Sequence, residues 1–258
     1  MSKLAIISTH PIQYQVPLFR LLKKNGLNFK VFFASKHGAN SKEIDPEFLK
    51  KIKWDIGKNI LSGYKSKFSE NQKYKIDDFR LNFRNIEKEL VEGKFKYVLI
   101  LGWNNLHYLK AIYYAIKHNI KIILRVETNL ESKINPLKKF FKFIILKELF
   151  KKISYFLTIG KLNKKFLIHH GVPKKKILSA PYFIDNSFFY TKKKKISSKK
   201  KILFIGKLIN RKNPFEFLKL AEAYKSMDDI EFIMIGEGIL KKDCEEFIKK
   251  KNYSMFLY

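Results

Sequence analysis

Cysteine, arginine and glycine are scarce in this chain of 258 residues. Cys244 is its sole cysteine, so no disulfide can form within the chain, and a reducing compartment is expected. The sequence contains no run of about 18 apolar residues, which a membrane-spanning helix would require. The apolar run near the N-terminus is too short for a signal peptide. We therefore expect a cytoplasmic protein that is either soluble or peripheral on the inner face of the membrane.

The formal net charge is +31, yet only five of the 54 basic residues are arginine. Surfaces dedicated to phosphate or nucleic acid usually use arginine, because its planar guanidinium binds an anion through two hydrogen bonds. The excess of Lys, Ile, Phe and Asn is typical of an AT-rich genome, to which we attribute most of the charge. The remainder favours attraction for anions such as nucleotide diphosphates or acidic lipid headgroups.

A nucleic-acid-binding module is the main alternative, because basic and aromatic residues are interleaved. The lysines are spread evenly, however, and no RNA- or DNA-binding motif is recognisable. We therefore do not expect nucleic acid as a partner.

Short apolar runs alternate with longer helical patterns along most of the chain. Helices are expected at 16–25, 106–119 and 136–153, and buried strands at 3–9, 29–35, 97–102, 121–128 and 155–160. In 106–119 the spacing predicts a buried face of Leu106, Leu109, Ile112, Tyr113 and Ile116. Apolar strands separated by helices predict an α/β fold with a parallel sheet covered on both faces.

Two polar segments interrupt this pattern. Residues 36–90 are rich in lysine and predict a long excursion from the sheet, with a helix near 78–90. Residues 191–200 form a basic linker between a first domain, 1–190, and a second strand–helix alternation in 201–258. The second part contains about half of the elements that an independent doubly wound domain needs.

Candidate anion-binding residues follow the first strand of the second domain. Gly206 ends the strand and allows a tight turn, and Pro214 suits the first turn of the next helix. Lys207, Arg211 and Lys212 lie between them, at the edge of a parallel sheet where ligands bind. This pattern is compatible with a diphosphate clamp and with a solvated basic loop.

A second glycine loop follows the next strand. It contains Gly236, Glu237 and Gly238, but Lys241 stands where a dinucleotide-binding loop has its third glycine. Hydride transfer is therefore disfavoured, and with it a dehydrogenase-like nucleotide-sugar epimerase.

Six stretches resemble retaining glycosyltransferases of family four, whose GT-B fold has two Rossmann-like domains facing a cleft. "ILFIGKLINRKNPFEFLKLAEAY" and "IEFIMIGEGILKKDCEEF" resemble the opening of the family's second domain. "HHGVPKKKILSAPYFIDNSFF" is similar to the segment that closes its first domain. "STHPIQYQVPLFRLL" and "GWNNL" with "LRVETNLE" resemble one branch of the family. The motifs occur in the family's order and cover about 1–35 and 97–251.

The resemblance implies a donor site in the second domain. Lys207, at the family's arginine position, and Lys212 would bind the diphosphate of a nucleotide-sugar donor and stabilise negative charge as the sugar–phosphate bond breaks. Gly206 and Arg211 would complete this site. The loop of Gly236, Glu237 and Gly238 would lie near the nucleoside. Asn213 stands at a glycine position of the family, which leaves the shape of the turn after Lys212 open.

Two absences qualify this resemblance. The family's paired glutamates, which hold the donor sugar and ribose, would lie beyond Tyr258, so the second domain is expected to be truncated. A protein that ends there should bind its donor poorly and turn over little. The Asp-x-Asp motif of metal-dependent glycosyltransferases is absent, so we expect no metal, and no cofactor besides the nucleotide-sugar co-substrate.

Acceptor-side residues are expected on loops of the first domain. The resemblance places His10, Gln13 and Tyr14 toward the cleft, where Gln13, Tyr14 and Asn129 would bind the acceptor. His10 is a candidate general base, with a capping or orienting role as the alternative.

Arg125 and Glu127 alternate on one strand. An arginine in so apolar a run should be paired, so we expect Arg125 to contact Glu127, and we group both with His10 as catalytic candidates. Asn104 and Asn105 are expected to cap the helix that follows them.

Residues 136–156 combine lysines with a dense Phe, Ile and Leu face. This composition suits a helix packed on the sheet and also an interfacial helix attracted to anionic lipids. We predict a retaining, metal-independent glycosyltransferase that moves a sugar from a nucleotide diphosphate to a cell-envelope glycan or lipid-linked acceptor. The alternative is a basic α/β protein that binds nucleic acid or a membrane surface without catalysis.

Overall fold

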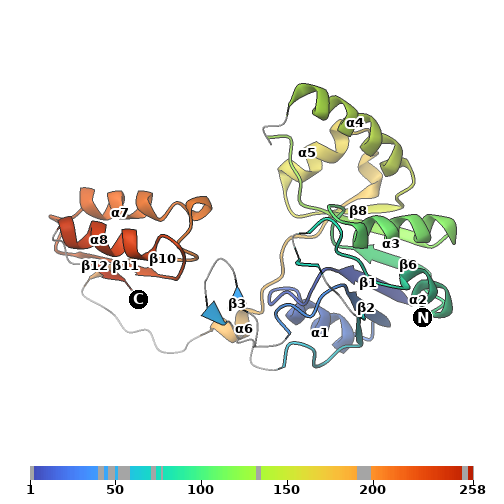
Figure 1. Ribbon diagram of the computed structural model, residues 1–258, viewed down its shortest axis with the longest axis horizontal. Helices are drawn as coiled ribbons and strands as arrows, with labels where there is room; N and C mark the ends of the chain where they lie inside the picture. The colour runs from blue at the N-terminus through green and yellow to red at the C-terminus, as the bar shows by residue number, and fades with distance from the viewer. Residues whose placement is uncertain are drawn as a thin grey trace. The chain divides into compact units, whose positions relative to one another are not determined.

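The computed structural model describes residues 3–39, 44–45, 50–51, 59–70, 74–76, 78–131, 135–190, 199–251 and 255–257. The chain divides into two compact units, which are described separately below. Unit 1 comprises Met1–Asn40 and Trp54–Phe189, and unit 2 comprises Ser41–Lys53 and Tyr190–Tyr258. Each unit is built around a parallel sheet with helices packed on it (Figure 1).

In its described part, unit 1 contains a seven-stranded parallel sheet with the order β5-β2-β1-β6-β7-β8-β9. The five strands expected from the apolar runs are confirmed, and their ends agree within a few residues. Two further strands, β5 and β9, are too short to stand out in the sequence. The strands are β1 (Leu4–Ser8), β2 (Phe29–Phe33), β5 (Ser66–Phe68), β6 (Tyr97–Ile100), β7 (Lys121–Val126), β8 (Tyr155–Thr158) and β9 (Ile177–Ser179).

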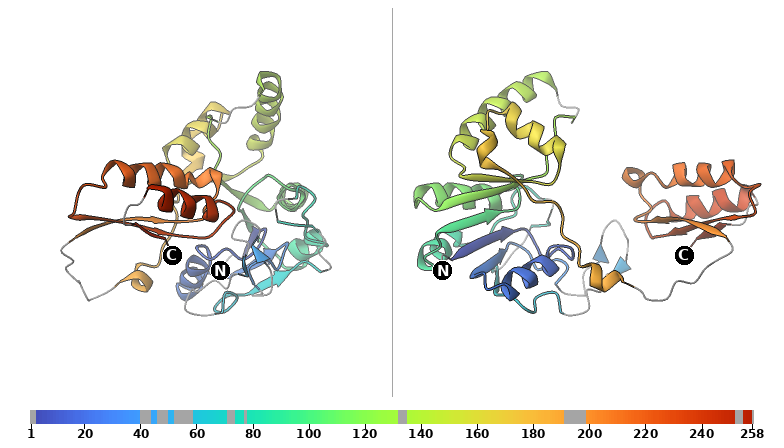
Figure 2. Two further views of the ribbon diagram at one scale, coloured as in Figure 1. Left: turned by 60° about the vertical axis from the view of Figure 1, so that its left-hand side comes forward. Right: turned by 180° about the vertical axis from the view of Figure 1, so that it is seen from behind.

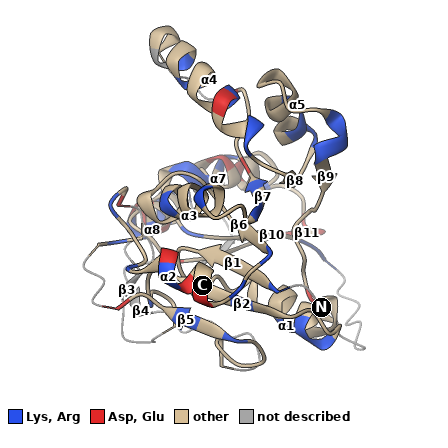
Figure 3. Cartoon of the chain, turned by 90° about the vertical axis from the view of Figure 1, so that its right-hand side faces the viewer, with Lys and Arg blue, Asp and Glu red and all other residues tan. Residues whose placement is uncertain are grey.

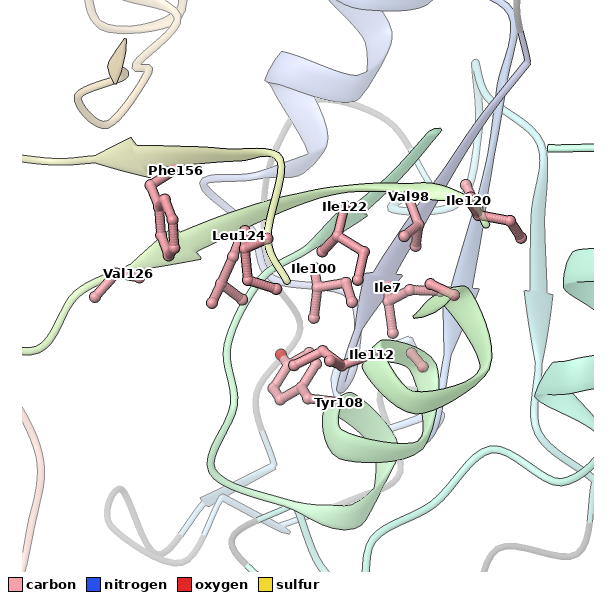
Figure 4. Packing of buried hydrophobic residues seen from close by; sticks show 14 of the residues in the cluster. Ile7, Val98, Ile100, Tyr108, Ile112, Ile120, Ile122, Leu124, Val126 and Phe156 are labelled. Atoms are coloured by element: carbon pink, nitrogen blue, oxygen red, sulfur yellow. The ribbon is translucent and has the colours of Figure 1, made fainter. Parts of the chain in front are cut away.

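Helices cover both faces of this sheet, as expected for apolar parallel strands. On one face, Ile6 of β1 and Val31 of β2 pack with Val16 and Phe19 of α1. On the other face, residues of the central strands pack on α3 and, further along, on α2, α4 and α5 (Figure 4). The helices are α1 (Val16–Lys24), α2 (Ile86–Glu92), α3 (Leu106–Lys117), α4 (Pro136–Lys151), α5 (Lys161–His169) and α6 (Asn186–Phe189).

The buried face of α3 differs from the one expected. Tyr113 is 61% exposed, and Leu106 and Leu109 are only partly buried. Of the expected face only Ile112 is buried, together with His107, Tyr108, Ala111 and Ala115. Apolar side chains of α3 itself project on most sides of the helix, so periodicity alone does not select the buried face. The two alanines have no bulk beyond Cβ, which allows the helix backbone to lie close to β6 and β7. At the start of α3, Asn105 Oδ1 accepts a hydrogen bond from the Tyr108 amide, so the expected cap is confirmed.

The expected excursion leaves the sheet after β2 and returns at β5. Its helix, α2, begins at Ile86, later than the sequence suggests. Arg20 of α1 anchors the returning chain: its Nη2 donates to the Asn59 carbonyl at 2.7 Å and its Nε to the Ser62 carbonyl at 3.1 Å. A short antiparallel pair, β3 (Ile44–Asp45) and β4 (Lys50–Lys51), lies within the excursion.

Unit 2 contains a three-stranded parallel sheet, β10 (Lys200–Ile205), β11 (Ile230–Ile235) and β12 (Met255–Leu257). Two of these strands were expected and β12 was not. Helices α7 (Pro214–Ala223) and α8 (Lys241–Lys251) lie on the same face of the sheet (Figure 2). Their core contains Leu208, Leu218, Ala221, Phe232, Met234 and Cys244. On the opposite face, the side chains of Leu203, Ile205 and Ile235 are exposed. Most of the expected linker, 191–198, lies outside the described residues.

One buried histidine makes unit 1 sensitive to acid. His107 of α3 is fully buried, its Nε2–H donates to the Ser8 carbonyl at 3.0 Å, and burial lowers its pKa to about 4. This folded-state pKa lies below the ordinary value of about 6.5, so the unfolded chain binds the proton more readily. The stability that depends on a neutral His107 is therefore fully present above about pH 6.5 and is lost as the pH falls toward 4.

We expect the free energy of unfolding of unit 1 to fall by about 3 kcal/mol between pH 6.5 and 4 through this residue. In His107→Gln this part of the pH dependence should disappear, although the variant is less stable at pH 7. Urea titrations followed by tryptophan fluorescence would measure it, since Trp103 packs on Phe150 and Phe166 in this core. The exposed His169→Gln controls for loss of a histidine. Equal pH slopes in H107Q and wild type would contradict the assignment.

Candidate functional site

The carboxyl ends of the unit 1 strands lie along one edge of the sheet, because every pair in it is parallel. Open α/β sheets bind ligands at this edge. The loop after β1 carries His10, Gln13 and Tyr14, and β7 is followed by Glu127 and Asn129. Tyr182, which the sequence reasoning missed, comes after β9 at the same edge.

Three of these side chains and Arg125 of β7 form one group, which we call the Arg125 cluster: Tyr14, Arg125, Glu127 and Tyr182. Arg125 Nε lies 3.5 Å from Glu127 Oε1, so the expected pairing is confirmed. The Arg125 guanidinium lies over the Tyr182 ring, 4.8 Å from its centroid. Tyr182 meets Tyr14 edge to face at 5.2 Å. Three segments that are distant in sequence therefore meet in this cluster.

Both tyrosines of the cluster are protonated near neutral pH. Burial and the Glu127 carboxylate raise the pKa of Tyr14. Burial and a hydrogen bond to Glu127 raise the pKa of Tyr182. Their hydroxyls are therefore hydrogen-bond donors, while Glu127 is an acceptor with a half-exposed side chain. Such a mixed set of donors and acceptors suits the hydroxyl groups of a carbohydrate.

His10, in the loop after β1, contacts Thr9 and His37. Its Nδ1 lies 2.9 Å from Thr9 Oγ1, and its ring meets that of His37 edge to face at 5.4 Å. Burial, followed by the nearby His37, lowers the pKa of His10 to about 4. A base of that pKa is weak near neutral pH. The low pKa therefore favours the orienting role over the general base, and the catalytic roles of His10, Arg125 and Glu127 stay predictions.

The two remaining acceptor candidates are Asn129 and Gln13, which are not part of the Arg125 cluster. Asn129 Oδ1 accepts a hydrogen bond from the Glu131 amide at 3.0 Å. Asn129 also lines a small cavity of about 30 Å³, shared with Lys142, Phe143 and His170. That volume suits a single water molecule and not a sugar. Gln13 is partly buried. Acceptor binding by these two residues stays a prediction.

In unit 2, the loops after β10 and β11 continue side by side beyond the sheet. The Gly206 amide donates to the Ile235 carbonyl at 3.0 Å, and the Leu208 amide donates to the Glu237 carbonyl at 2.8 Å. A Cβ atom at Gly236 would lie 1.9 Å from the Gly206 carbonyl oxygen. One at Gly238, whose φ is +154°, would lie 2.4 Å from the Leu208 carbonyl oxygen. The glycines are therefore needed for close backbone approach.

The three basic candidate residues of unit 2 lie between the end of β10 and the start of α7. Lys207 is partly buried, whereas Arg211 and Lys212 are exposed on a short 3₁₀ turn, Asn210–Lys212. Asn213 has φ 51° and ψ 53°, the left-handed conformation that glycine adopts most readily and asparagine tolerates. The turn after Lys212 thus has a backbone shape that glycine would also adopt. Diphosphate binding here, and nucleoside binding at 236–238, stay predictions.

Three further features concern binding of nucleic acid, metal ions and membranes. Lysine and arginine occur on helices, strands and loops of both units, and not on a single element (Figure 3). In the ranges that the structure describes, no three His, Cys, Asp or Glu side chains gather as metal ligands would. Within the same ranges, no helix has the length and apolar character needed to cross a membrane.

No protein-family profile and no curated protein match this chain. Solved structures match it over its full length. A glycosyltransferase from Rickettsia africae ESF-5 is 12% identical with a TM-score of 0.65, and the match covers 68% of that chain. HepE of Anabaena, in complex with UDP and glucose, is 10% identical with a TM-score of 0.61 and 68% covered. UDP-GlcNAc 2-epimerase from Neisseria meningitidis, bound to UDP-GlcNAc, is 15% identical with a TM-score of 0.54 and 72% covered.

The matches confirm the expected α/β fold of GT-B type, with Rossmann-like parallel sheets. Identities this low establish a fold and not a reaction, and the matches include both glycosyltransferases and epimerases. The missing third glycine therefore argues against a dinucleotide site, but not against epimerases as a class. Membership of family four and a retaining mechanism stay predictions.

The contact between the two unit 2 loops predicts different outcomes for neighbouring glycines. Gly236→Ala should destabilise unit 2 by about 1–3 kcal/mol, because its Cβ atom would meet backbone that cannot move aside. Gly206→Ala is the matched control, since its Cβ atom would meet only the Phe204 ring at an ordinary 3.7 Å. Hydrogen exchange of the β10 and β11 amides, followed by mass spectrometry, would measure the loss. Equal exchange in the two variants would show that the loops are not held by this contact.

Proposed function

We propose that this chain is a retaining, metal-independent glycosyltransferase that takes its sugar from a nucleotide diphosphate. One observation carries the proposal: in a GT-B-type fold, three basic residues lie between the end of β10 and the start of α7. Solved structures with this fold hold UDP or a UDP-sugar. Family four, retention and a cell-envelope glycan or lipid-linked acceptor are the parts that depend on the sequence resemblance.

In this proposal, unit 2 stabilises the leaving group. Lys207 and Lys212 place ammonium groups beside the diphosphate, and the first turn of α7 adds backbone N–H groups and the positive end of the helix dipole. As the bond from sugar C1 to the diphosphate oxygen breaks, the growing negative charge meets fixed positive charge. Lysine acts as a point charge, so Lys207 cannot bind a phosphate through two parallel hydrogen bonds as an arginine would. The positive charge comes from side chains, so the proposal requires no metal.

The edge of the unit 1 sheet holds the acceptor. Tyr14 and Tyr182 donate hydrogen bonds, and Glu127 accepts the hydrogen of an acceptor hydroxyl. A bond forms from the acceptor oxygen to sugar C1, and the acceptor's proton passes to the diphosphate or to Glu127. His10, whose ring is held by Thr9, orients the β1 loop.

Helix α4 favours a membrane surface as a second partner. Leu146 and Phe150 anchor it in the core of unit 1. Five large apolar side chains are 45–67% exposed on the same helix, among exposed or half-exposed lysines: Leu137, Phe140, Phe141, Ile144 and Ile145. The helix therefore packs on its own unit and also presents an apolar, basic surface, which supports the interfacial interpretation of residues 136–156. We propose that α4 lies on the anionic inner face of the membrane.

Donor binding gives the first test. We expect Lys212→Gln to weaken UDP binding to the chain about tenfold, because one charge-assisted contact to phosphate is lost. Isothermal titration calorimetry with UDP would measure this. Lys249→Gln, which removes the same charge at an exposed position near the end of α8, should bind as the wild type does. The diphosphate site would be misplaced if K212Q and K249Q bound UDP equally well.

Vesicle sedimentation tests the surface formed by α4. The double substitution Phe140→Ser and Phe141→Ser should lower binding to phosphatidylglycerol vesicles several-fold, because two exposed aromatic side chains no longer enter the interface. Phe189→Ser removes an equally exposed phenylalanine on α6 and serves as the control. Binding should also weaken with salt and be low on phosphatidylcholine. If the double variant and F189S sedimented alike, α4 would not be the membrane contact.

A further inference from the structure

Arg125 is a buried cation whose hydrogen-bonding capacity is largely unused. Its side chain is only 9% exposed, and its Nε and Nη2 atoms are buried with no hydrogen-bond partner. These two nitrogens carry three of the five N–H groups of a guanidinium. A charged donor buried without an acceptor is costly, so a side chain of this kind calls for an explanation.

Glu127 only partly compensates this charge. Its carboxylate is 3.5 Å from Arg125 Nε, whereas a charge-assisted hydrogen bond is about 2.7–2.9 Å long. The Glu127 side chain is also 45% exposed and hydrogen-bonded to Tyr182. A half-exposed ion pair of this length contributes little to stability. An external anion that replaced Glu127 would therefore displace a weak partner and satisfy donors that are otherwise unpaired.

The side chains that cover the guanidinium are accessible themselves. Tyr182, whose ring lies over Arg125, is 44% exposed, and Tyr14 beside it is 40% exposed. Rotation of Glu127 toward solvent would free the Nε and Nη2 side of the guanidinium, while Tyr182 stays over its face. That side presents two parallel N–H groups, a geometry that matches two oxygens of one carboxylate or phosphate. The tyrosine rings offer flat surfaces on which a sugar ring can pack.

We infer that the acceptor bound at the unit 1 edge is acidic, and that Arg125 receives two oxygens of its carboxylate or phosphate group. This inference rests on the proposed function, since it names the chemical class of that enzyme's acceptor. Glu127 then acts as an internal anion that occupies the guanidinium until the acceptor arrives. Binding of the acceptor frees the Glu127 carboxylate to receive the acceptor's hydroxyl hydrogen.

Competition between Glu127 and an external anion predicts opposite effects for two substitutions. The probes are D-glucuronate and inorganic phosphate, with D-glucose as the neutral control, titrated into the full chain and followed by NMR chemical shifts. Arg125→Gln should weaken binding of at least one anion about tenfold or more. Glu127→Gln should strengthen binding of that anion about threefold, because the internal competitor is gone. The anion that responds identifies the acceptor group as a carboxylate or a phosphate.

Matched substitutions separate this site from the general positive charge of the chain. Lys165→Gln and Glu131→Gln make the same charge changes at exposed positions and should bind the anions as the wild type does. Should R125Q not fold, Arg125→Lys keeps the charge but removes the paired N–H groups, and it should still weaken binding several-fold. UDP binding by R125Q should stay at the wild-type level, so failure of the donor site and failure of this inference are distinguishable.

Two results would overturn the inference. Equal anion binding by R125Q and K165Q would mean that the lysine-rich surface alone attracts the anion. Weaker anion binding by E127Q than by wild type would mean that Glu127 supports the site and does not compete for Arg125.

Discussion

Parallel pairing of buried strands is the constraint on which both units depend. Because neighbouring strands run in the same direction, every connection returns across a face of the sheet, and the carboxyl ends of all strands collect at one edge. In unit 1 this brings residues after β1, β7 and β9 together in the Arg125 cluster. In unit 2 it aligns the loops after β10 and β11 so closely that two glycines are required. Both candidate sites are therefore consequences of strand direction.

The sequence predicted the architecture well because long buried strands leave a strong signal. The run 97–102, YVLILG, has apolar side chains at nearly every position, which a strand covered on both faces requires. Strands β5, β9 and β12 have three residues each, too few for any periodic pattern. The prediction of the buried face of α3 was wrong for a different reason. Its burial is decided by Ala111 and Ala115, whose small size permits close packing, whereas a periodicity argument gives most weight to large side chains.

The sites were predictable only where two residues interact along the chain. Glu127, just after β7, is two positions from Arg125 on that strand, so their pairing could be inferred from alternation. Tyr182 joins them from a segment more than fifty residues away, and nothing local to "APYFID" marks it as their partner. His10 shows the reverse case: its residue type suggested a base, whereas its burial beside His37 makes it a weak one. Neighbours in space decide such roles, and the sequence alone does not reveal them.

Charge count is a poor guide to function in a chain of net charge +31. Most of its lysines can lie in water at little cost, so their number implies no ligand. A buried arginine is different, because removing its donors from water is costly unless an acceptor replaces the lost hydration. Arg125 meets only a distant carboxylate and the face of a tyrosine. Among the cations of unit 1 that the structure describes, Arg125 is therefore informative, because its buried N–H groups lack acceptors within the chain.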